Sequence, residues 1–397
     1  MAVTAHFDVV VVGGGPAGAT AAMDLARSNR SVLLIDRAGR IKPCGGAIPP
    51  RLVTDFAIPD HLLVARVSSA RMISPSDVAV DMPIDGGYVG MVDREEFDEW
   101  LRTRAVSCGA ERAVGTFETF RQMNDGIAEV TYRGTDGVAH AIRTRMVIGA
   151  DGANSAVARH AMPESERVPF VFAYHEIVRA PVSAATAGYD SKRCDVYYQG
   201  KISPDFYGWV FPHGDTASIG VGSANKGFSL KSAVKDLREV SGLQGAETIR
   251  REGAPIPLHP LKKWDNGRNV LLVGDACGVV APASGEGIYY AMYSGRLAAE
   301  AVDEALETNN GRALAMARRR FMKAHGRVFW VLGWLQYIWY KNDNRRERFV
   351  KMCRDPDVQR LTWQAYMNKE LVRSSPMAHV RVFFKDVAHF FGLASPR

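Results

Sequence analysis

The stretch FDVVVVGGGPAGATAAMDLARS, residues 7–28, decides the fold of this chain. It opens with a short run rich in valine, which is typical of a strand buried on both faces of a parallel sheet. A glycine-rich loop follows directly, and the residues after the loop have helical spacing and are strong helix formers. The run SVLLIDR at 31–37 then predicts a second buried strand. Strand, glycine turn, helix and strand in this order predict one βαβ unit.

The loop itself fits the pattern G-x-G-x-x-G with Gly13, Gly15 and Gly18. The first glycine permits a tight turn, the second lets a pyrophosphate approach the backbone, and the third lets helix and strand pack closely. Asp36 stands where an acidic side chain takes a pair of ribose hydroxyls, and Arg37 follows it. We predict that these residues bind a dinucleotide; the alternative is a glycine-rich turn without a ligand.

The bulk composition is that of an ordinary globular protein. The chain has 397 residues, of which 47% are hydrophobic and 23% charged, so we expect a large domain with a second module. Its five cysteines are odd in number, widely spaced and without a CxxC pair, which argues against a disulfide framework and against a metal site. Because residues 1–15 lead into the glycine loop where a signal peptide would continue, we expect a cytoplasmic chain.

Three further stretches follow in order: VDREEFDEWL (92–101), VIGADGANSAVAR (147–159) and NVLLVGDACGVVAPASGEGIYYAM (269–292). Together with the βαβ unit they resemble the flavin-binding pattern of the aromatic hydroxylase-like FAD oxidoreductases. The resemblance spans residues 7 to about 300 and implies FAD as the cofactor. It implies flavin-binding roles for Arg94, Asp151, Gly274, Asp275, Gly285 and Gly287.

The third of these stretches has a direct physical interpretation. Asp275 follows an apolar strand and is placed to accept hydrogen bonds from the ribityl hydroxyls, and SGEGI is placed to bring a helix N-terminus to the flavin ring. The positive end of that helix would stabilise negative charge on a reduced flavin. The alternatives are structural: Asp275 and Asp151 as turn or helix caps, and Arg94 as a surface arginine.

Between the second and third stretches lie strand-like runs such as CDVYYQG, YGWVFP and TASIGVG, whose period of two predicts a mostly antiparallel sheet over the flavin. We expect an α/β fold, with a Rossmann-type FAD-binding domain of the aromatic hydroxylase-like kind, an inserted substrate-binding sheet and a C-terminal helical region. The expected boundaries are 1–160 and 266–305 for the FAD-binding domain, 161–265 for the substrate domain, and 306–397 for the C-terminal region.

Two short motifs indicate the substrate. KPCGG (42–46) follows the βαβ unit, and PDFYGWVFP (204–212) fits P-x-x-Y-x-W-x-F-P. They resemble the geranylgeranyl reductase family, which saturates isoprenoid double bonds, and the resemblance is closest to the branch that reduces the geranylgeranyl tail of (bacterio)chlorophyll or geranylgeranyl diphosphate. In a strand, Tyr207, Trp209 and Phe211 project to one face and form an apolar wall suited to an isoprenoid tail. The alternative is a core strand.

The reaction that this family resemblance implies couples a hydride to protonation of the other alkene carbon. Tyr207 is the candidate proton donor, Trp209 is placed to steady cationic character, and Cys44 is the rival donor or a residue that shapes the pocket. No second strand-linked G-x-G-x-x-G is present, so the reductant is expected to visit transiently: NADPH by the resemblance, with a ferredoxin-type donor as the alternative.

Three alternatives to this function stay open: another carrier of the isoprenoid chain, another flavin-dependent reaction, and binding without catalysis. The sequence has no run of the DDxxD type that would bind a diphosphate, which favours an esterified pigment over geranylgeranyl diphosphate or a geranylgeranyl lipid. A flavin monooxygenase or halogenase shares the FAD motifs, although Tyr207 stands where halogenases have the first tryptophan of Trp-x-Trp-x-Ile-Pro. A pigment carrier without catalysis would explain the aromatic wall but not the flavin motifs.

The net charge of +7 suits an acidic ligand, a membrane surface or nucleic acid, but no nucleic-acid-binding motif is present, so we expect no nucleic acid partner. VFWVLGWLQYIWY (328–340) is too short to span a bilayer and is interpreted first as a core helix, with a tunnel wall or an interfacial segment as alternatives. HVRVFFKDVAHFFGL (379–393) again combines aromatic and basic residues. We predict peripheral association with the cytoplasmic side of a photosynthetic membrane.

Overall fold

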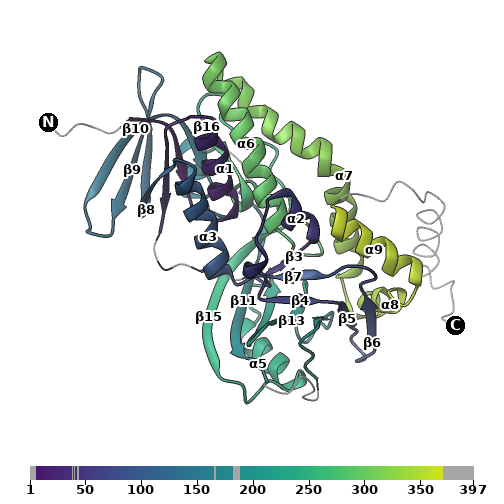
Figure 1. Ribbon diagram of the computed structural model, residues 1–397. Coiled ribbons are helices and arrows are strands. Elements are labelled where there is room, and N and C mark those ends of the chain that lie inside the picture. The colour runs from purple at the N-terminus through teal and green to yellow at the C-terminus, as the bar shows by residue number, and fades with distance from the viewer. Residues whose placement is uncertain are drawn as a thin grey trace. The chain divides into compact units, whose positions relative to one another are not determined.

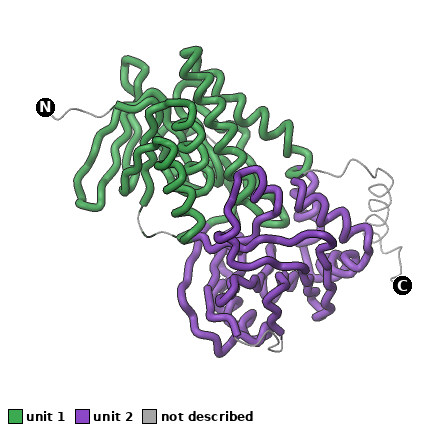
Figure 2. Tube along the Cα trace, viewed as in Figure 1, with its two compact units in different colours: residues 1–41, 95–170, 255–329 green, residues 42–94, 171–254, 330–397 purple. Residues whose placement is uncertain are grey.

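The computed structural model describes residues 6–37, 39, 41–42, 44–164, 167–181 and 188–369. The chain divides into two compact units, each assembled from three separate stretches (Figure 2). Unit 1 comprises 1–41, 95–170 and 255–329, and unit 2 comprises 42–94, 171–254 and 330–397. Residues 171–254, which form the middle stretch of unit 2, lie within the expected substrate domain, whereas residues 42–94, also in unit 2, lie within the stretch expected for the FAD-binding domain.

A six-stranded sheet forms the centre of unit 1. Its strands are β1 (His6–Val12), β2 (Val32–Asp36), β8 (Glu111–Gln122), β9 (Ala128–Gly134), β10 (Ala139–Gly149) and β16 (Val270–Leu272). β1 pairs in parallel with β2 and with β10, and β16 pairs in parallel with β10. β9 pairs antiparallel with β8 and β10. Val9, Val10 and Val11 are fully buried, as predicted for a strand with both faces covered.

Helices complete unit 1. They are α1 (Pro16–Arg27), α3 (Arg94–Ser107), α4 (Ala156–Ala161), α6 (Ile288–Thr308) and the first part of α7 (Ala315–Trp339), with the short helices η2 (Gly274–Cys277) and η3 (Gly311–Leu314) between them. Figure 1 shows α1 and α6 side by side. A Cβ added at Gly295 would lie 2.2 Å from the carbonyl oxygen of Ala17, so a glycine is needed for this close approach.

Unit 2 is built around a seven-stranded sheet. In spatial order its strands are β15 (Thr248–Pro257), β11 (Phe170–Arg179), β14 (Thr216–Ser223), β13 (Gly208–His213), β12 (Arg193–Tyr197), β5 (Ser69–Ile73) and β6 (Ala79–Pro83). The β11–β14, β13–β14, β12–β13 and β5–β6 pairs are antiparallel and the β5–β12 pair is parallel. The three runs predicted as strands are β12, β13 and β14, so a mostly antiparallel sheet is confirmed.

Shorter elements complete the N-terminal part of unit 2. They are a small antiparallel sheet of β3 (Ala47–Ile48), β7 (Val89–Met91) and β4 (Ala65–Val67), with α2 (Pro50–Asp55) and η1 (Asp60–Leu62).

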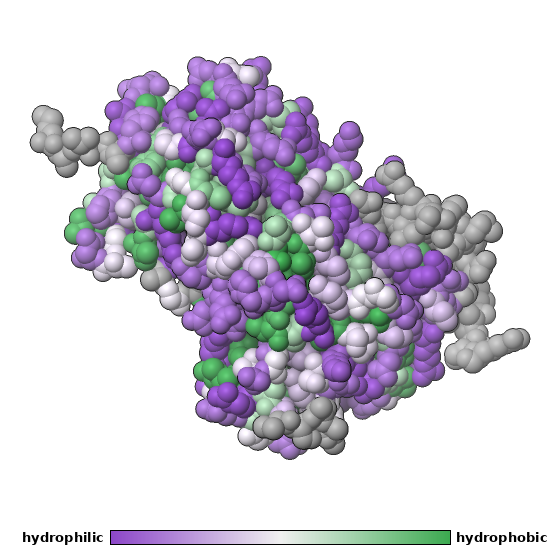
Figure 3. All heavy atoms as spheres, in the orientation of Figure 1, coloured by the Kyte–Doolittle hydropathy of each residue, from purple (hydrophilic) through white to green (hydrophobic). Residues whose placement is uncertain are grey.

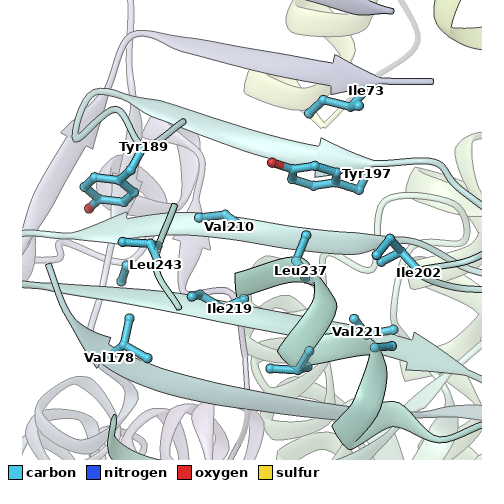
Figure 4. Close-up of a cluster of buried hydrophobic side chains, with 13 residues drawn as sticks. Ile73, Val178, Tyr189, Tyr197, Ile202, Val210, Ile219, Val221, Leu237 and Leu243 are labelled. Carbon is cyan, nitrogen blue, oxygen red and sulfur yellow. The ribbon is translucent and has the colours of Figure 1, made fainter. Parts of the chain in front are cut away.

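The core of the large sheet lies under α5 (Leu230–Val240). Val210, Ile219 and Leu237 are buried in one hydrophobic cluster on this side (Figure 4). Since side chains alternate along a strand, Val210 in this cluster directs its neighbours Trp209 and Phe211 to the other face of the sheet. The register of β13 therefore separates the core from the aromatic row that the sequence predicts.

As far as residue 369, the C-terminal part consists of the end of α7, α8 (Asp343–Met352) and α9 (Pro356–Asn368). Residues 328–339 are helical, but the interpretation as a core helix holds for one face only. Phe329 and Trp339 are buried, whereas Trp330 is 72% exposed, Trp334 45% and Tyr337 73%. In the described part of the chain, no helix combines the length and apolar character needed to cross a bilayer. The run at 379–393 lies outside the described residues.

Candidate functional site

The glycine loop after β1 is shaped by three different demands on its glycines. Gly13 has φ +106°, and its N–H donates to the carbonyl of Ile35 at 2.8 Å. A Cβ at Gly18 would lie 1.9 Å from the Gly13 oxygen, whereas a Cβ at Gly15 would meet nothing within 4 Å. The loop therefore leaves open space at the one glycine where a pyrophosphate is expected. Gly15 is the N-cap residue of α1, and no side chain caps the N–H groups at the start of this helix. These residues therefore fit the phosphates of a dinucleotide.

Asp36, at the end of β2, is oriented by an arginine that sequence reasoning missed. Arg102 of α3 places Nη1 3.1 Å from Asp36 Oδ2 and 3.3 Å from the carbonyl oxygen of Gly14. Arg102 is held in turn by Glu99 at 2.9 Å. One guanidinium thus ties the acidic residue to the glycine loop. Arg37, the next residue, is exposed.

Asp151 pairs with the start of α4, in line with the capping interpretation, although Ser155 is the N-cap residue of that helix. Its Oδ1 accepts from Ser155 Oγ at 2.5 Å, and its Oδ2 accepts from the backbone N–H groups of Ala156 at 2.6 Å and Val157 at 3.1 Å. These are the first residues of α4. Burial raises the pKa of this carboxyl group, and the hydrogen bonds oppose that rise. Asp151 therefore fixes the turn after β10.

The Gly-Asp pair after β16 is rigidly placed. Gly274 has φ +61°, and its N–H donates to Ser294 Oγ of α6 at 3.0 Å. Asp275 is 9% exposed, in η2. Gly285 has φ +64°, and Gly287 is the N-cap residue of α6, where a Cβ would lie 3.0 Å from Val280. The loop that was expected to present a helix N-terminus does lead into α6.

A carboxylate also stands at that helix N-terminus. Glu286 Oε1 accepts from the backbone N–H of Tyr289 at 3.0 Å, and Glu286 is 7% exposed. One N–H group that was expected to face a reduced flavin is therefore already paired. The sequence signal was the glutamate within SGEGI, three residues before Tyr289.

Unit 2 carries the aromatic row. The Tyr207 and Trp209 ring centroids lie 6.2 Å apart, and those of Trp209 and Phe211 lie 6.5 Å apart. Tyr207 is 9% and Trp209 4% exposed, whereas Phe211 is half-buried.

Arg94, at the start of α3, is also buried, so the surface alternative for this arginine is wrong.

The two short motifs, about 160 residues apart in the chain, meet in unit 2. A Cβ at Gly45 would lie 2.7 Å from Phe211 Cδ2 and 3.9 Å from Trp209 Nε1. A Cβ at Gly46 would lie 2.5 Å from His213 Nε2. The N–H of Gly46 approaches Cys44 Sγ at 3.4 Å. Glycines are needed here because the backbone of 44–46 runs directly against the aromatic row.

The candidate proton donor sits in a cluster of tyrosines. The ring of Tyr207 lies 6.0 Å from that of Tyr198, which lies 5.5 Å from that of Tyr340. Burial raises the pKa of Tyr207 well above its usual value. The phenol is therefore a weak acid. Burial disfavours the phenolate that would remain after Tyr207 donates its proton.

In the described residues, no group of three or more His, Cys, Asp or Glu side chains is arranged to hold a metal ion. On the face shown in Figure 3, hydrophilic side chains cover most of the surface, with smaller hydrophobic areas between them.

Comparison with known proteins agrees with this geometry. The FAD binding domain family matches residues 63–317, and an NAD(P)-binding Rossmann-like domain matches 11–56. The chain is 57% identical over 392 residues to a geranylgeranyl diphosphate reductase of Rhodobacter capsulatus, covering 98% of this chain and 99% of that one. It is 38% identical to the chloroplastic geranylgeranyl diphosphate reductase of Oryza sativa, covering 94% and 84%. It is 33% identical to digeranylgeranylglycerophospholipid reductase 1 of Methanopyrus kandleri, covering 79% and 84%.

Solved structures show the same fold. A geranylgeranyl bacteriochlorophyll reductase-like protein from Thermoplasma acidophilum has a TM-score of 0.80 at 24% identity, covering 94% of this chain and 99% of that one. A flavin-dependent brominase has a TM-score of 0.75 at 18% identity, covering 96% and 99%. The predicted fold class is confirmed by these neighbours.

Proposed function

Because this chain belongs to the geranylgeranyl reductase family, flavin-dependent oxidoreductases that act on carbon–carbon double bonds, we propose that it saturates the geranylgeranyl tail of a (bacterio)chlorophyll. The observation that carries this proposal is the contact between the motifs at 42–46 and 204–212, where Gly45 packs against Phe211. An isoprenoid tail has no polar group along its length, so its site must use shape and apolar area, worth roughly 25 cal/mol per Å² buried.

The cofactor is FAD. We assign its phosphates to the loop of Gly13, Gly15 and Gly18, and its ribose to Asp36, which Arg102 orients. Gly274, Asp275, Gly285 and Gly287, together with Arg94, are assigned to the flavin half. Asp151 is assigned to it indirectly, through the turn that it caps. When bound and reduced, FAD supplies the hydride.

Tyr207, Trp209 and Phe211 are proposed as the wall of the substrate site. Phe211 is half-buried and Cys44 partly exposed, so the accessible edge of the wall lies where the two motifs meet. The rings of Tyr207 and Trp209 are held behind it. Their faces would steady positive charge that develops on the tertiary carbon when the alkene is protonated.

Tyr207 and Cys44 remain the two candidates for the proton donor. Tyr207→Phe removes the hydroxyl and keeps the ring, and Cys44→Ser serves as its counterpart. If Tyr207 donates, Tyr207→Phe loses turnover while it retains FAD, and Cys44→Ser keeps most of its activity. Undiminished reduction by Tyr207→Phe would remove it from this role.

The carrier of the isoprenoid chain is tested by one anaerobic experiment. The protein and NADPH or dithionite are incubated with geranylgeranylated bacteriochlorophyll in one sample and with geranylgeranyl diphosphate in another. The masses of the products are then measured by mass spectrometry. Successive gains of two hydrogens on the pigment are expected. Gains on the diphosphate alone would favour geranylgeranyl diphosphate, the substrate for which the Rhodobacter capsulatus relative is named. Oxygen consumption with an unreduced chain would indicate a monooxygenase or halogenase instead.

NADPH is proposed as the reductant. The NAD(P)-binding match covers residues 11–56, which is the same βαβ unit that holds the FAD loop, so it adds no second dinucleotide site. A transient visit by NADPH fits this arrangement, and a ferredoxin-type donor is the alternative. Stopped-flow reduction of the bound flavin by each donor, with rates compared at equal concentration, distinguishes them.

We also assign peripheral membrane association to the exposed face of α7. Trp330, Trp334 and Tyr337 are spaced four and three residues apart, so they lie on one helix face. Tryptophan and tyrosine favour the interface of a bilayer, and Lys341 follows the helix as an exposed cation. Such a surface would give the protein access to a substrate that is dissolved in a photosynthetic membrane.

A further inference from the structure

A line of hydrogen-bonded polar side chains crosses the large sheet of unit 2, starting from Trp209 of the aromatic row. Trp209 Nε1 donates to Ser218 Oγ at 3.1 Å, and Ser218 Oγ lies 3.0 Å from His175 Nδ1. His175 Nε2 is hydrogen-bonded to Glu252. Trp209, Ser218 and His175 are 4%, 0% and 2% exposed. The four residues come from β13, β14, β11 and β15, so the line runs across neighbouring strands.

The direction of these hydrogen bonds follows from the donors available. An indole N–H can only donate, so the Ser218 oxygen accepts from Trp209. The Ser218 hydroxyl then donates to His175 Nδ1, and Nε2–H donates to the Glu252 carboxylate. The neutral histidine with its proton on Nε2 is therefore the form that pairs every donor in the line.

The far end of the line balances the charge of Glu252. Arg250 Nε lies 2.8 Å from Glu252 Oε1, and Arg250 Nη2 lies 3.0 and 2.9 Å from the two carboxylate oxygens of Asp93. The Glu252 carboxylate therefore lies between His175 and Arg250. Asp93 immediately precedes Arg94, which is assigned above to the flavin half.

Serine, histidine and glutamate in this order also resemble the hydrolytic triad, but the geometry excludes that role. Ser218 is completely buried, and its oxygen already accepts a hydrogen bond from Trp209. A nucleophile needs a free lone pair directed at an accessible substrate.

The geometry points to a positioning role: Ser218, His175 and Glu252 fix the plane of the Trp209 indole, and thereby the shape of the isoprenoid wall. The indole packs closely against Gly220, where a Cβ would lie 2.1 Å from Trp209 Cζ2. The close approach of Gly220 and the hydrogen bond at the indole nitrogen together restrict the orientation of the ring. The link to the isoprenoid chain rests on the proposed function, whereas the orientation of Trp209 does not.

The test uses protein in which the tryptophan indole nitrogens carry ¹⁵N, with Trp209→Phe to assign the Trp209 resonance. Ser218→Ala removes the acceptor, and its Trp209 N–H proton is expected to move upfield. His175→Asn retains an oxygen near the position of Nδ1, where it can accept from the Ser218 hydroxyl. In His175→Gln the amide lies further out, toward Glu252, and leaves the Ser218 hydroxyl without that acceptor. The Trp209 resonance is therefore expected to move more in His175→Gln than in His175→Asn.

Ser223→Ala, on the same strand, is the matched control, since Ser223 bonds Asp205 and belongs to no part of the line. Equal shifts in the two His175 variants, zero included, would overturn the proposal. So would a Trp209 resonance that Ser218→Ala moves no further than Ser223→Ala does.

Kinetics give the second measurement. Ser218→Ala and His175→Gln are expected to raise the KM for the geranylgeranyl substrate roughly fivefold and to lower kcat, because Trp209 is also proposed to steady the developing positive charge, with the rate of flavin reduction little changed. An unchanged KM in both variants would contradict a role in shaping the wall. If the unmodified protein reduces no geranylgeranyl substrate, the proposed function fails, while the NMR comparison still decides whether the line positions Trp209.

Discussion

Arg102 and Asp36 form an ion pair of 3.1 Å, and the same guanidinium reaches the carbonyl oxygen of Gly14 in the glycine loop. Since Asp36 is assigned to the ribose of FAD, Arg102→Met is expected to lower FAD affinity about tenfold by releasing this carboxylate. Titration of the apoprotein with FAD measures the effect. Arg112→Met is the control, because Arg112 also pairs with Glu99. Equal affinities in both variants would argue against the assignment.

Gly15 and Gly18 are expected to respond differently to alanine. Gly15 has φ −73° and ψ −177°, which alanine adopts readily, and a Cβ there meets nothing within 4 Å. Gly15→Ala should therefore keep the Tm of the apoprotein but lose FAD. Gly18→Ala drives a Cβ into the Gly13 carbonyl and should lower the apoprotein Tm itself. Thermal unfolding with and without FAD checks both; normal FAD binding by Gly15→Ala would contradict the phosphate assignment.

The charge of Glu286 at the start of α6 is expected to oppose accumulation of negative charge on the flavin. Glu286→Gln removes that charge and can retain the hydrogen bond from Tyr289. The two-electron reduction potential should rise by roughly 30 mV. Spectroelectrochemical titration measures it, with Glu304→Gln, exposed on the same helix, as the control. An unchanged potential in Glu286→Gln would place the flavin elsewhere.

His213 makes the stability of the protein depend on pH. Burial lowers its pKa from 6.5 to about 4. Below pH 6.5 the histidine of the unfolded chain binds a proton, whereas in the folded chain it does not do so until about pH 4. The stabilisation is therefore fully present above pH 6.5, and the free energy of unfolding falls as the pH drops toward 4. On acidification from about pH 7.5 to about pH 5, this residue should lower the free energy of unfolding by about 2 kcal/mol.

Urea unfolding at the two pH values tests this contribution. His213→Gln should show a smaller loss of stability on acidification than the unmodified chain, and His61→Gln, at an exposed position, should show the same loss as the unmodified chain. If all three lose stability equally, other groups determine the acid response.

The exposed face of α7 is tested by flotation with anionic liposomes. Replacing Trp330, Trp334 and Tyr337 by serine should leave the protein at the bottom of the gradient, since the aromatic rings would supply the interfacial contact. The control replaces three exposed hydrophobic residues elsewhere, Phe172, Val240 and Ile249. An unmodified protein that stays wholly at the bottom would refute membrane association.

The sequence by itself determined the βαβ unit. β1, the glycine loop, α1 and β2 follow from periodicity and from backbone demands within thirty or so residues, and the different roles of Gly13, Gly15 and Gly18 are local consequences of that turn. The strand character of 208–213 and the projection of Trp209 and Phe211 to one face are local in the same sense.

Tertiary structure alone decided which distant residues meet. Arg102 of α3 reaches Asp36 of β2 across 66 positions. His175 joins Ser218 across 43 positions, through a strand pairing whose register no local pattern encodes. The exposure of one face of α7 and the cap at Asp151 also depended on their neighbours. The physical reason is that a side chain's chemistry is set by its type, whereas its partner, its burial and its pKa are set by packing between segments that are remote in the chain.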